Sequence, residues 1–233
     1  MCKLTYTQAI SFWEEYLERT ILPQYPRARI VLLRPTMSLM LNLTPDPLTL
    51  KEALPDLSKT SHIFLPINNN TNPSLPEGGS HWSLLVVSVI DGVAFHYDSL
   101  GDENDRPAML ANDKLSRLLG QRLRFVSLRD APLQENGSDC GVFVCLNMQK
   151  LLIERLLKVD NRDKVSMSLR GRHVDAKTGR KEMLRTIEWF RKEGEKRRSR
   201  SASPWAGSRG TGEKSRSPPR IGDEQEEERQ SIR

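Results

Sequence analysis

Residues 132–141 read Pro132-Leu-Gln-Glu-Asn-Gly-Ser-Asp-Cys-Gly141, and they place a cysteine where an apolar helix is expected to begin. Ser and Asp are good helix-capping residues, and the apolar pattern from Cys140 onward predicts a long buried helix through Leu157. The positive end of a helix dipole favours a thiolate over a thiol. Cys140 is therefore the candidate nucleophile, and Gly141 beside it leaves the backbone open to a substrate.

A nucleophile that attacks a carbonyl needs further groups beside it, and three side chains upstream of Cys140 could supply them. His81 follows a Gly-Gly loop and heads a predicted strand, so it is the best candidate for the general base among four histidines. Asp98, at the end of the next strand, would accept a hydrogen bond from the other ring nitrogen. Gln134 lies six residues before Cys140, and its amide would form an oxyanion hole with the Cys140 backbone N–H. This set of residues predicts a cysteine protease.

The same residue types have structural interpretations elsewhere in the chain. His62, His96 and His173 are interpreted as structural histidines, and Cys145 as a buried core cysteine. Trp82 is either a core residue or a lid that presses on the substrate backbone. A lid of that kind would admit only small substrate residues, which would select glycine.

The predicted hairpin between the strands of His81 and Asp98 poses a geometric problem. A two-residue turn at Asp91-Gly92 would pair Asp98 with Leu85. That pairing leaves Asp98 four residues, or about 13 Å, away from His81 along the strand. Contact between the two side chains requires a turn centred nearer Val89–Ile90, or a bulge or bend.

The composition separates a folded part from a polar tail. The chain has 233 residues, 37% of them hydrophobic, and a formal net charge of +6. Residues 191–233 hold 12 of the 36 Lys and Arg but only 8 of the 30 Asp and Glu, so most of the net charge lies there. A nucleic-acid-binding domain is not indicated. We expect residues 191–233 to form a disordered tail, Arg/Ser-rich and then acidic, that is either a solvated segment or a nuclear-import or phosphorylation-regulated one.

The cysteine pattern and the termini suggest a cellular location. The three cysteines include no Cys-x-x-Cys pair, which argues against a disulfide framework and a zinc site. The sequence has neither a signal-peptide pattern at its start nor an apolar run of membrane-spanning length. We therefore expect a soluble, monomeric protein of the nucleus and cytoplasm that needs no metal or cofactor and binds neither a membrane nor a specific nucleic acid.

Helix and strand patterns predict an α+β domain over residues 1–190. Helices are expected over 6–20, 35–42, 106–119, 140–157 and 174–192, and strands over 30–33, 63–67, 82–90, 93–98 and 123–128. Pro66 inside the second strand suggests a sheet edge or a strand end. The central sheet should be mostly antiparallel and should pack against the buried helix that carries Cys140 at its N-terminus.

Together these residues resemble the ubiquitin-like-protein protease family, the Ulp or sentrin-specific proteases. The family's residue types and spacing are found in His81-Trp82, Asp98-Ser99, Gln134 and Asp139-Cys140-Gly141. Residues 64–70, 78–86 and 95–99 are most similar to the short deneddylases of the family. Relatives carry a Trp-Leu-Asn-Asp segment before the first helix. Residues 1–8 do not, so either the sequence or its gene model lacks this wall of the channel for the modifier's tail, or substrate binding is altered.

The resemblance implies a papain-like cysteine protease fold with Cys140 as nucleophile, His81 as base, Asp98 as its partner and Gln134 in the oxyanion hole. It also implies that the Gly-Gly tail of a ubiquitin-like modifier is bound by Trp82, Asp139 and Gly141. The expected reaction is removal of a Nedd-type modifier from its precursor or from targets such as cullins. Alternatives are a SUMO-specific protease and a catalytically weak module that binds ubiquitin-like proteins. A third alternative is acyl transfer to an acceptor other than water.

Overall fold

The computed structural model describes residues 5–72, 74–75, 78–158 and 165–201. The chain divides into two compact units, Met1–Trp189 and Phe190–Arg233, and the sheet lies in the first. Its strand order is β1-β2-β3-β4-β5, so every strand pairs with its neighbours in the sequence. The strands are β1 (Ile30–Leu32), β2 (His62–Asn68), β3 (Trp82–Ser88), β4 (Val93–Tyr97) and β5 (Arg124–Ser127).

The sheet is antiparallel at its centre and parallel at both edges. β2 pairs with β3, and β3 with β4, in antiparallel fashion, whereas β1 and β5 are parallel to their neighbours. Of the two alternatives for Pro66, the edge strand is wrong, because β2 lies between β1 and β3, and a position near the strand end is confirmed, because β2 ends at Asn68. β1 pairs only with the first three residues of β2, from His62 to Phe64. Pro66 lies beyond them, so β1 does not need the N–H that proline lacks.

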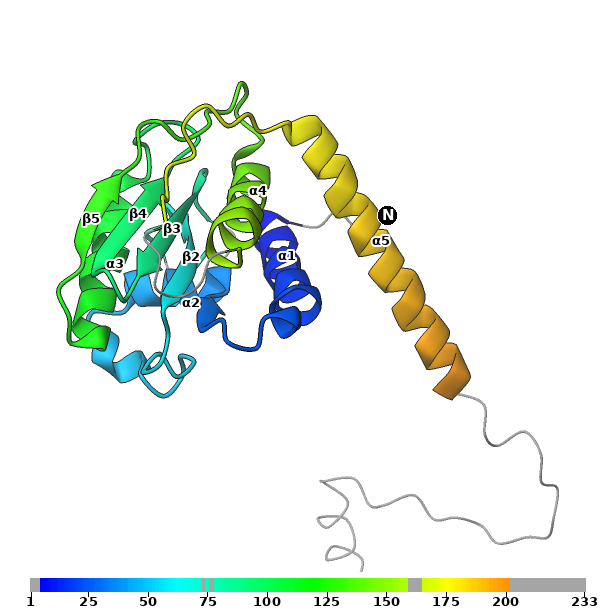
Figure 1. Ribbon diagram of the computed structural model, residues 1–233, viewed down its shortest axis with the longest axis horizontal. Helices are drawn as coiled ribbons and strands as arrows, with labels where there is room; N and C mark the ends of the chain where they lie inside the picture. Colours follow the sequence, from blue (N-terminus) through cyan, green and yellow to red (C-terminus); the bar gives the residue numbers. More distant parts are fainter. Residues whose placement is uncertain (1–4, 73, 76–77, 159–164, 202–233) are drawn as a thin grey trace, which may run out of the picture. The chain divides into compact units, whose positions relative to one another are not determined.

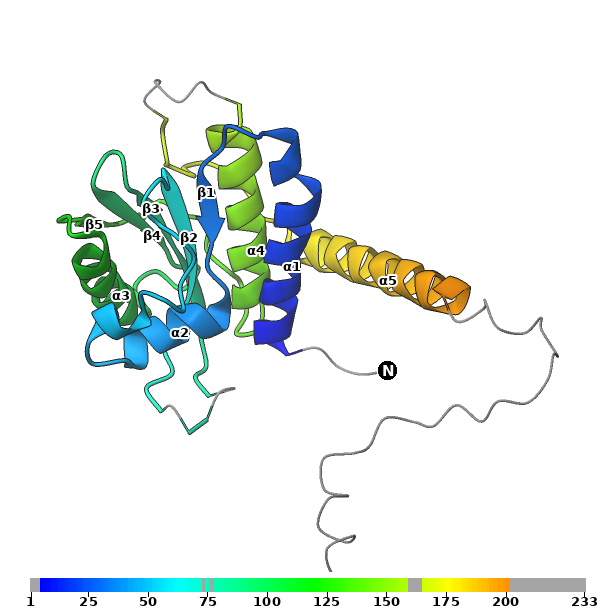
Figure 2. The same ribbon diagram turned by 90° about the horizontal axis from the view of Figure 1, so that it is seen from below.

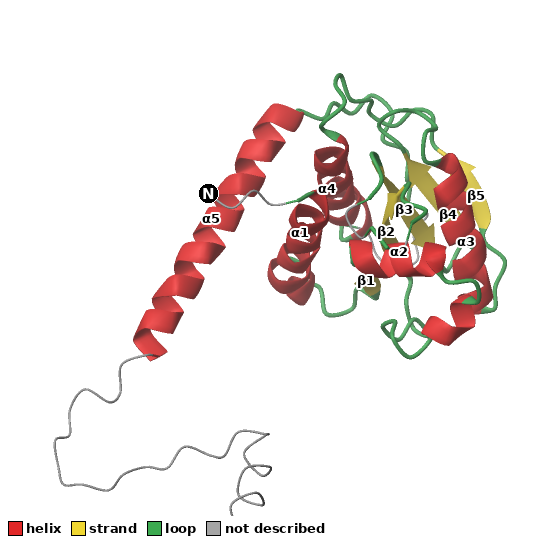
Figure 3. Ribbon diagram, turned by 180° about the vertical axis from the view of Figure 1, so that it is seen from behind, coloured by secondary structure: helices red, strands yellow, loops and turns green. Residues whose placement is uncertain are grey.

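Helices cover both faces of this sheet. α1 (Tyr6–Thr20) and α4 (Cys140–Lys150) lie on one face, and α2 (Pro35–Leu43) and α3 (Asp105–Leu119) lie on the other (Figures 1 and 2). Figure 3, from the opposite side, shows α2 and α3 in front of the strands. Alternate residues of β3 enter the two cores: Leu84 and Val86 pack with α1 and α4, and Leu85 and Val87 with α2 and α3.

α4 belongs to the interior of the domain. Six successive residues from Cys140 to Cys145 are all buried, as are Asn147 and Met148. The predicted helix through Leu157 is α-helical only to Lys150, and Leu151–Leu156 continues it as a π-helix. The candidate nucleophile is therefore carried by one of the most enclosed elements of the fold.

α5 (Ala176–Ser201) is longer than the sequence predicted. It was expected to end near Lys192, with disorder from residue 191 onward. Lys, Arg and Glu are good helix formers, and an ion pair of 2.7 Å between Lys196 and Glu193 supports this part of α5. The rest of the predicted tail, residues 202–233, lies outside the described residues. Within the described ranges, no helix has the length and apolar character needed to span a bilayer.

Candidate active site

Cys140 is the first residue of α4, and only 2% of its surface is exposed. Asp139 precedes it as the capping residue, but its side chain makes no capping hydrogen bond, contrary to expectation. Its carboxylate instead forms an ion pair with Arg180 of α5 and accepts a hydrogen bond from Asn136 Nδ2 at 2.8 Å. A capping side chain could have accepted the Gly141 N–H. Because Asp139 does not, this N–H can bond to the Cys140 sulfur.

His81 and Asp98 form a buried hydrogen-bonded pair. His81 Nε2 lies 2.6 Å from Asp98 Oδ1, and each residue is 2% exposed. The Asp98 carboxylate also accepts the backbone N–H groups of Leu100 at 2.9 Å and Asn104 at 2.8 Å. Since Nε2 is engaged with Asp98, Nδ1 of His81 remains to bond to the Cys140 thiol.

The hairpin differs from the predicted two-residue turn, and the difference explains how His81 reaches Asp98. Ser88 pairs with Val93, so four residues, 89–92, form the connection. The Ser88 hydroxyl donates to the Asp91 carboxylate at 2.5 Å and accepts the Asp91 N–H at 3.3 Å, which closes the wider loop. The register shifts by two residues, so Asp98 follows the last pair, Leu84 with Tyr97, and turns toward His81.

Charges at the site favour a thiolate beside an imidazolium. Burial lowers the pKa of His81, but hydrogen bonds to Asp98 and Cys140 outweigh it and raise the pKa to about 9. Burial raises the pKa of Cys140, but the hydrogen bonds from His81 and from the Trp82 backbone N–H lower it below its ordinary value. Burial also raises the pKa of Asp98, and the His81 hydrogen bond more than offsets this, so the carboxylate stays ionised. A thiolate of this kind is the attacking form of cysteine.

Gln134 lies next to the site through its bonds to the residue after Asp98. Ser99 donates its hydroxyl to Gln134 Oε1 at 2.6 Å, and the Gln134 N–H donates to the Ser99 carbonyl at 2.9 Å. Gln134 Nε2 donates to the Asn136 carbonyl at 2.5 Å. One amide hydrogen is therefore used inside the loop, and donation of the second to an oxyanion stays a prediction.

Two asparagines that the sequence reasoning gave no role hold the backbone of His81. Asn69 Oδ1 accepts the His81 N–H at 3.1 Å, and Asn68 Nδ2 donates to the His81 carbonyl at 3.1 Å. Their signal in the sequence is a run of three asparagines at the end of a strand, where side-chain amides replace the lost ladder bonds.

Trp82, Asp139 and Gly141 were expected to bind substrate, and the structure gives each of them contacts within the chain. Trp82 is 8% exposed and shares a core cluster with Cys140, so most of its ring is core; its contact with a substrate tail stays a prediction. Asp139 is paired with Arg180. The Tyr6 ring of α1 fills the space where a Cβ of residue 141 would lie, and contact of a substrate with the Gly141 backbone stays a prediction.

Gly141→Ala should destabilise the protein by about 1–3 kcal/mol, because the added methyl overpacks this contact. A Cβ at position 141 would lie 2.6 Å from Tyr6 Cδ1. The ring would have to move, although its hydroxyl donates to the Ser138 carbonyl at 2.5 Å. Urea unfolding measures the loss.

The same substitution in a Tyr6→Ala background provides the control, because the clash is then absent and the cost should largely disappear. An equal cost in both backgrounds would show that the Tyr6 ring is not the obstacle.

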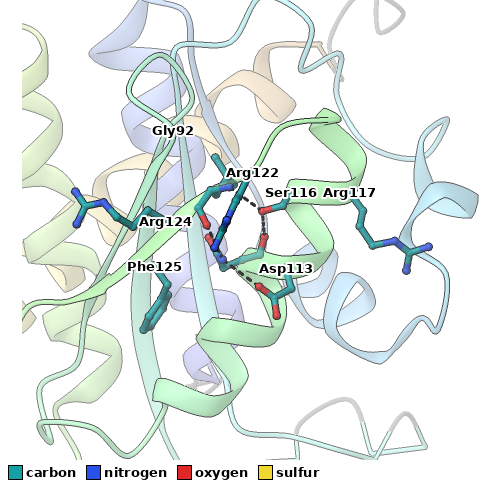
Figure 4. A pocket seen from close by; sticks show the side chains of 9 residues that line it. Gly92, Asp113, Ser116, Arg117, Arg122, Arg124 and Phe125 are labelled. Carbon is teal, nitrogen blue, oxygen red and sulfur yellow. Dashed lines mark hydrogen bonds between the residues drawn. The ribbon is translucent and has the colours of Figure 1, made fainter.

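The remaining candidates have structural surroundings. His96 is fully buried between Asp105 at 2.8 Å and the Ser83 hydroxyl at 2.9 Å, and Cys145 is fully buried within α4. A pocket of about 620 Å³ lies between α3 and the start of β5, lined by Arg122 and neighbours, and contains no predicted site residue (Figure 4). Among the described residues, no cluster of His, Cys, Asp or Glu could hold a metal ion.

Comparison with known proteins identifies relatives of this arrangement. The model of the Ulp1 protease family, C-terminal catalytic domain, matches residues 7–184. NEDD8-specific protease 2 of Schizosaccharomyces pombe is 40% identical over 182 residues, which are 76% of this chain and 43% of that protein. Human sentrin-specific protease 8 is 40% identical over 99 residues, 41% of this chain and 45% of that protein. The chain thus spans less than half the length of these curated relatives.

Solved structures share the fold. The Xanthomonas campestris effector protein XopD, solved bound to ubiquitin, superposes with a TM-score of 0.56 at 20% identity, covering 79% of this chain and 93% of that one. The SUMO protease Ulp1, solved with its catalytic cysteine oxidised to a sulfinic acid, gives a TM-score of 0.50 at 21% identity, covering 67% of this chain and 69% of that one. These likenesses confirm the α+β, papain-like expectation for the fold.

Proposed function

This chain belongs to the Ulp1 protease family, and we propose that it is a cysteine protease that cleaves after the C-terminal Gly-Gly of a NEDD8-type modifier. The observation that carries the proposal is the buried His81–Asp98 pair bonded to a cysteine at a helix N-terminus. The choice of modifier is supported by the similarity to NEDD8-specific protease 2 over 182 residues.

The chemistry assigned to these residues is acyl transfer in two steps. The Cys140 thiolate attacks the glycine carbonyl carbon, and the carbonyl electron pair moves to oxygen, where the Cys140 N–H and Gln134 Nε2 donate to it. The C–N bond then breaks, and His81 gives its proton to the departing amine, which leaves a thioester on Cys140. Neutral His81 next takes a proton from water as that water attacks the thioester, and the thiolate departs.

A panel of suicide probes tests this function. Each probe is a modifier (NEDD8, SUMO or ubiquitin) that ends in Gly-Gly and an electrophile. We expect the NEDD8 probe to label Cys140, located by peptide mass spectrometry. Preferential labelling by the SUMO probe would make the chain a SUMO protease. If no probe labels Cys140 although NEDD8 binds, the chain is a binding module and the proposed activity is wrong.

Gln134→Ala should lower kcat by about 10²–10³-fold, the usual loss when one oxyanion donor is removed. KM should change little, because the oxyanion exists only after attack. Cleavage of a NEDD8 fusion by the variant measures both constants. Gln149→Ala, on α4 well after Cys140, is the control and should keep normal kinetics. An unchanged kcat for Gln134→Ala would remove this side chain from the mechanism.

A further inference from the structure

Asn104 connects the two residues of the His81–Asp98 pair. It stands directly before α3 and is completely buried. Its backbone N–H donates to Asp98 Oδ2 at 2.8 Å. Its side-chain nitrogen Nδ2 lies 3.3 Å from the His81 carbonyl oxygen. Asn104 therefore forms hydrogen bonds with both His81 and Asp98.

The Asn104 amide also reaches the strands on which His81 depends. Nδ2 lies 3.2 Å from the Ile67 carbonyl of β2 and 3.1 Å from the Ser83 hydroxyl of β3. The two amide hydrogens are thus shared among three acceptors. The Ile67 and His81 carbonyls lie at the two ends of the loop that precedes His81, and Ser83 follows Trp82. The amide ties the end of β2 to the start of β3 at the point where His81 enters the site.

Asn104 does not do what an asparagine at this position usually does. Before a helix, the side-chain oxygen ordinarily accepts a backbone N–H of the first turn. Asn104 makes no such capping bond, and its Oδ1 has no hydrogen-bond partner among the described residues. A buried acceptor without a partner is unfavourable, so helix capping does not explain the residue. Departures from local rules of this kind concentrate at functional sites.

Placement of His81 relative to Asp98 matters because hydrogen bonding between them sets the charge at Cys140. The two side chains are joined at 2.6 Å, and a displacement of about 1 Å at a reacting group can cost 100-fold in rate. Asn68 and Asn69 hold only the backbone of His81, and Leu100 contacts only Asp98. Among the residues that the structure describes, Asn104 is the one outside the pair that bonds to both Asp98 and the His81 backbone.

We propose, on the basis of the proposed protease function, that Asn104 is a positioning residue whose side-chain amide and backbone N–H hold His81 and Asp98 at hydrogen-bonding distance from each other. Asn104 touches neither the thiol nor a substrate in this assignment, and it acts through His81.

Asn104→Ala in the full chain tests this proposal, with Asn112→Ala as the matched control. Asn112 is a buried asparagine within α3, the helix that Asn104 precedes, with its own carbonyl partner, Leu123, and its own unpartnered Oδ1. It lines the pocket of Figure 4, which contains no member of the His81–Asp98 pair. The two variants therefore remove equivalent groups at different places.

The first measurement is the rate of Cys140 alkylation by iodoacetamide as a function of pH, read on the Cys140 peptide. We expect Asn104→Ala to move this profile to higher pH and to lower kcat on a NEDD8 fusion by about 10–100-fold with little change in KM. Asn112→Ala should keep the wild-type profile and kcat. A wild-type profile for folded Asn104→Ala, or the same shift in Asn112→Ala, overturns the proposal.

Asn104→Ser separates positioning from helix capping and serves if the alanine variant does not fold. Serine caps helices as well as asparagine but is too short to reach the His81 carbonyl. A positioning role predicts the alkylation shift in this variant, and a capping role predicts wild-type behaviour. Because alkylation needs no modifier, these outcomes can be measured even if no suicide probe labels Cys140, a result that would contradict the proposed function alone.

Discussion

Cys140→Ala should lower turnover of a NEDD8 fusion by about 10⁶-fold, the scale of loss when the nucleophile of a catalytic triad is removed. Alanine at position 140 has no thiol, so it cannot form the thioester intermediate. The fold should persist, because the substitution removes a single sulfur atom from a site that is 2% exposed. Single-turnover cleavage and thermal unfolding of the same preparation check both parts.

Cys145→Ala is the matched control for that experiment. Cys145 lies in the same helix, is fully buried, and its pKa is raised by burial, so its thiol stays protonated and inert. Its replacement should leave turnover within a few-fold of wild type while lowering stability by about 1 kcal/mol through the small cavity. Residual cleavage by Cys140→Ala, or loss of cleavage in Cys145→Ala, would place the nucleophile elsewhere.

Asp98→Asn should lower kcat by about 10⁴-fold, the loss known for the equivalent change in a serine protease triad. The N–H groups of Leu100 and Asn104 donate to different oxygens of Asp98, and asparagine keeps only one of them, so thermal unfolding of the variant is measured beside its kinetics. The substitution removes the charge that stabilises protonated His81. Kinetics at pH 7 measure the effect, and Asp105→Asn, at the partly buried His96–Asp105 pair, should leave kcat unchanged.

The same variant should change how the site titrates. Without Asp98 the pKa of His81 falls from about 9, less imidazolium stabilises the thiolate, and Cys140 alkylation should require higher pH. Stability follows the same linkage. The folded pKa of His81 exceeds its unfolded value, so this contribution is present below the unfolded pKa and is lost as pH rises through about 9. Asp98→Asn should reduce that alkaline loss, since only the contribution of Cys140 then raises the pKa of His81, and unfolding between pH 6 and about 10 tests it.

Local patterns predicted the elements well where caps and periodicity agreed. The first helix was predicted over 6–20 and is found at Tyr6–Thr20, because Thr5 and Gln8 form a capping box at its start. The helix ending before Gly120 was predicted within one residue, since Gly120 takes the left-handed conformation that ends helices. In such places the signal lies within a few residues.

Features that depend on distant residues were missed or misjudged. The contact between Gly141 and the Tyr6 ring joins residues 135 positions apart, and no local pattern indicates it. Asp91-Gly92 predicts a tight turn, whereas the Ser88 hydroxyl closes a wider one. The link from Asn104 to His81 spans 23 positions and has no sequence signature beyond an asparagine before a helix. Residue types and spacing could indicate the chemistry, but not the side chains that hold it in place.

The order in which the site's parts occur along the chain has a consequence for synthesis. His81 and Asp98 are brought together by neighbouring strands, but Cys140 acquires its altered pKa only once α4 is seated against β3, where His81 and the Trp82 N–H reach the sulfur. A nascent or unfolded chain therefore carries an ordinary thiol, with a pKa of about 8.5. The reactive thiolate therefore forms only when the interior of the domain is complete, and an incompletely folded molecule lacks it. The rate of Cys140 alkylation at neutral pH then reports the fraction of folded molecules.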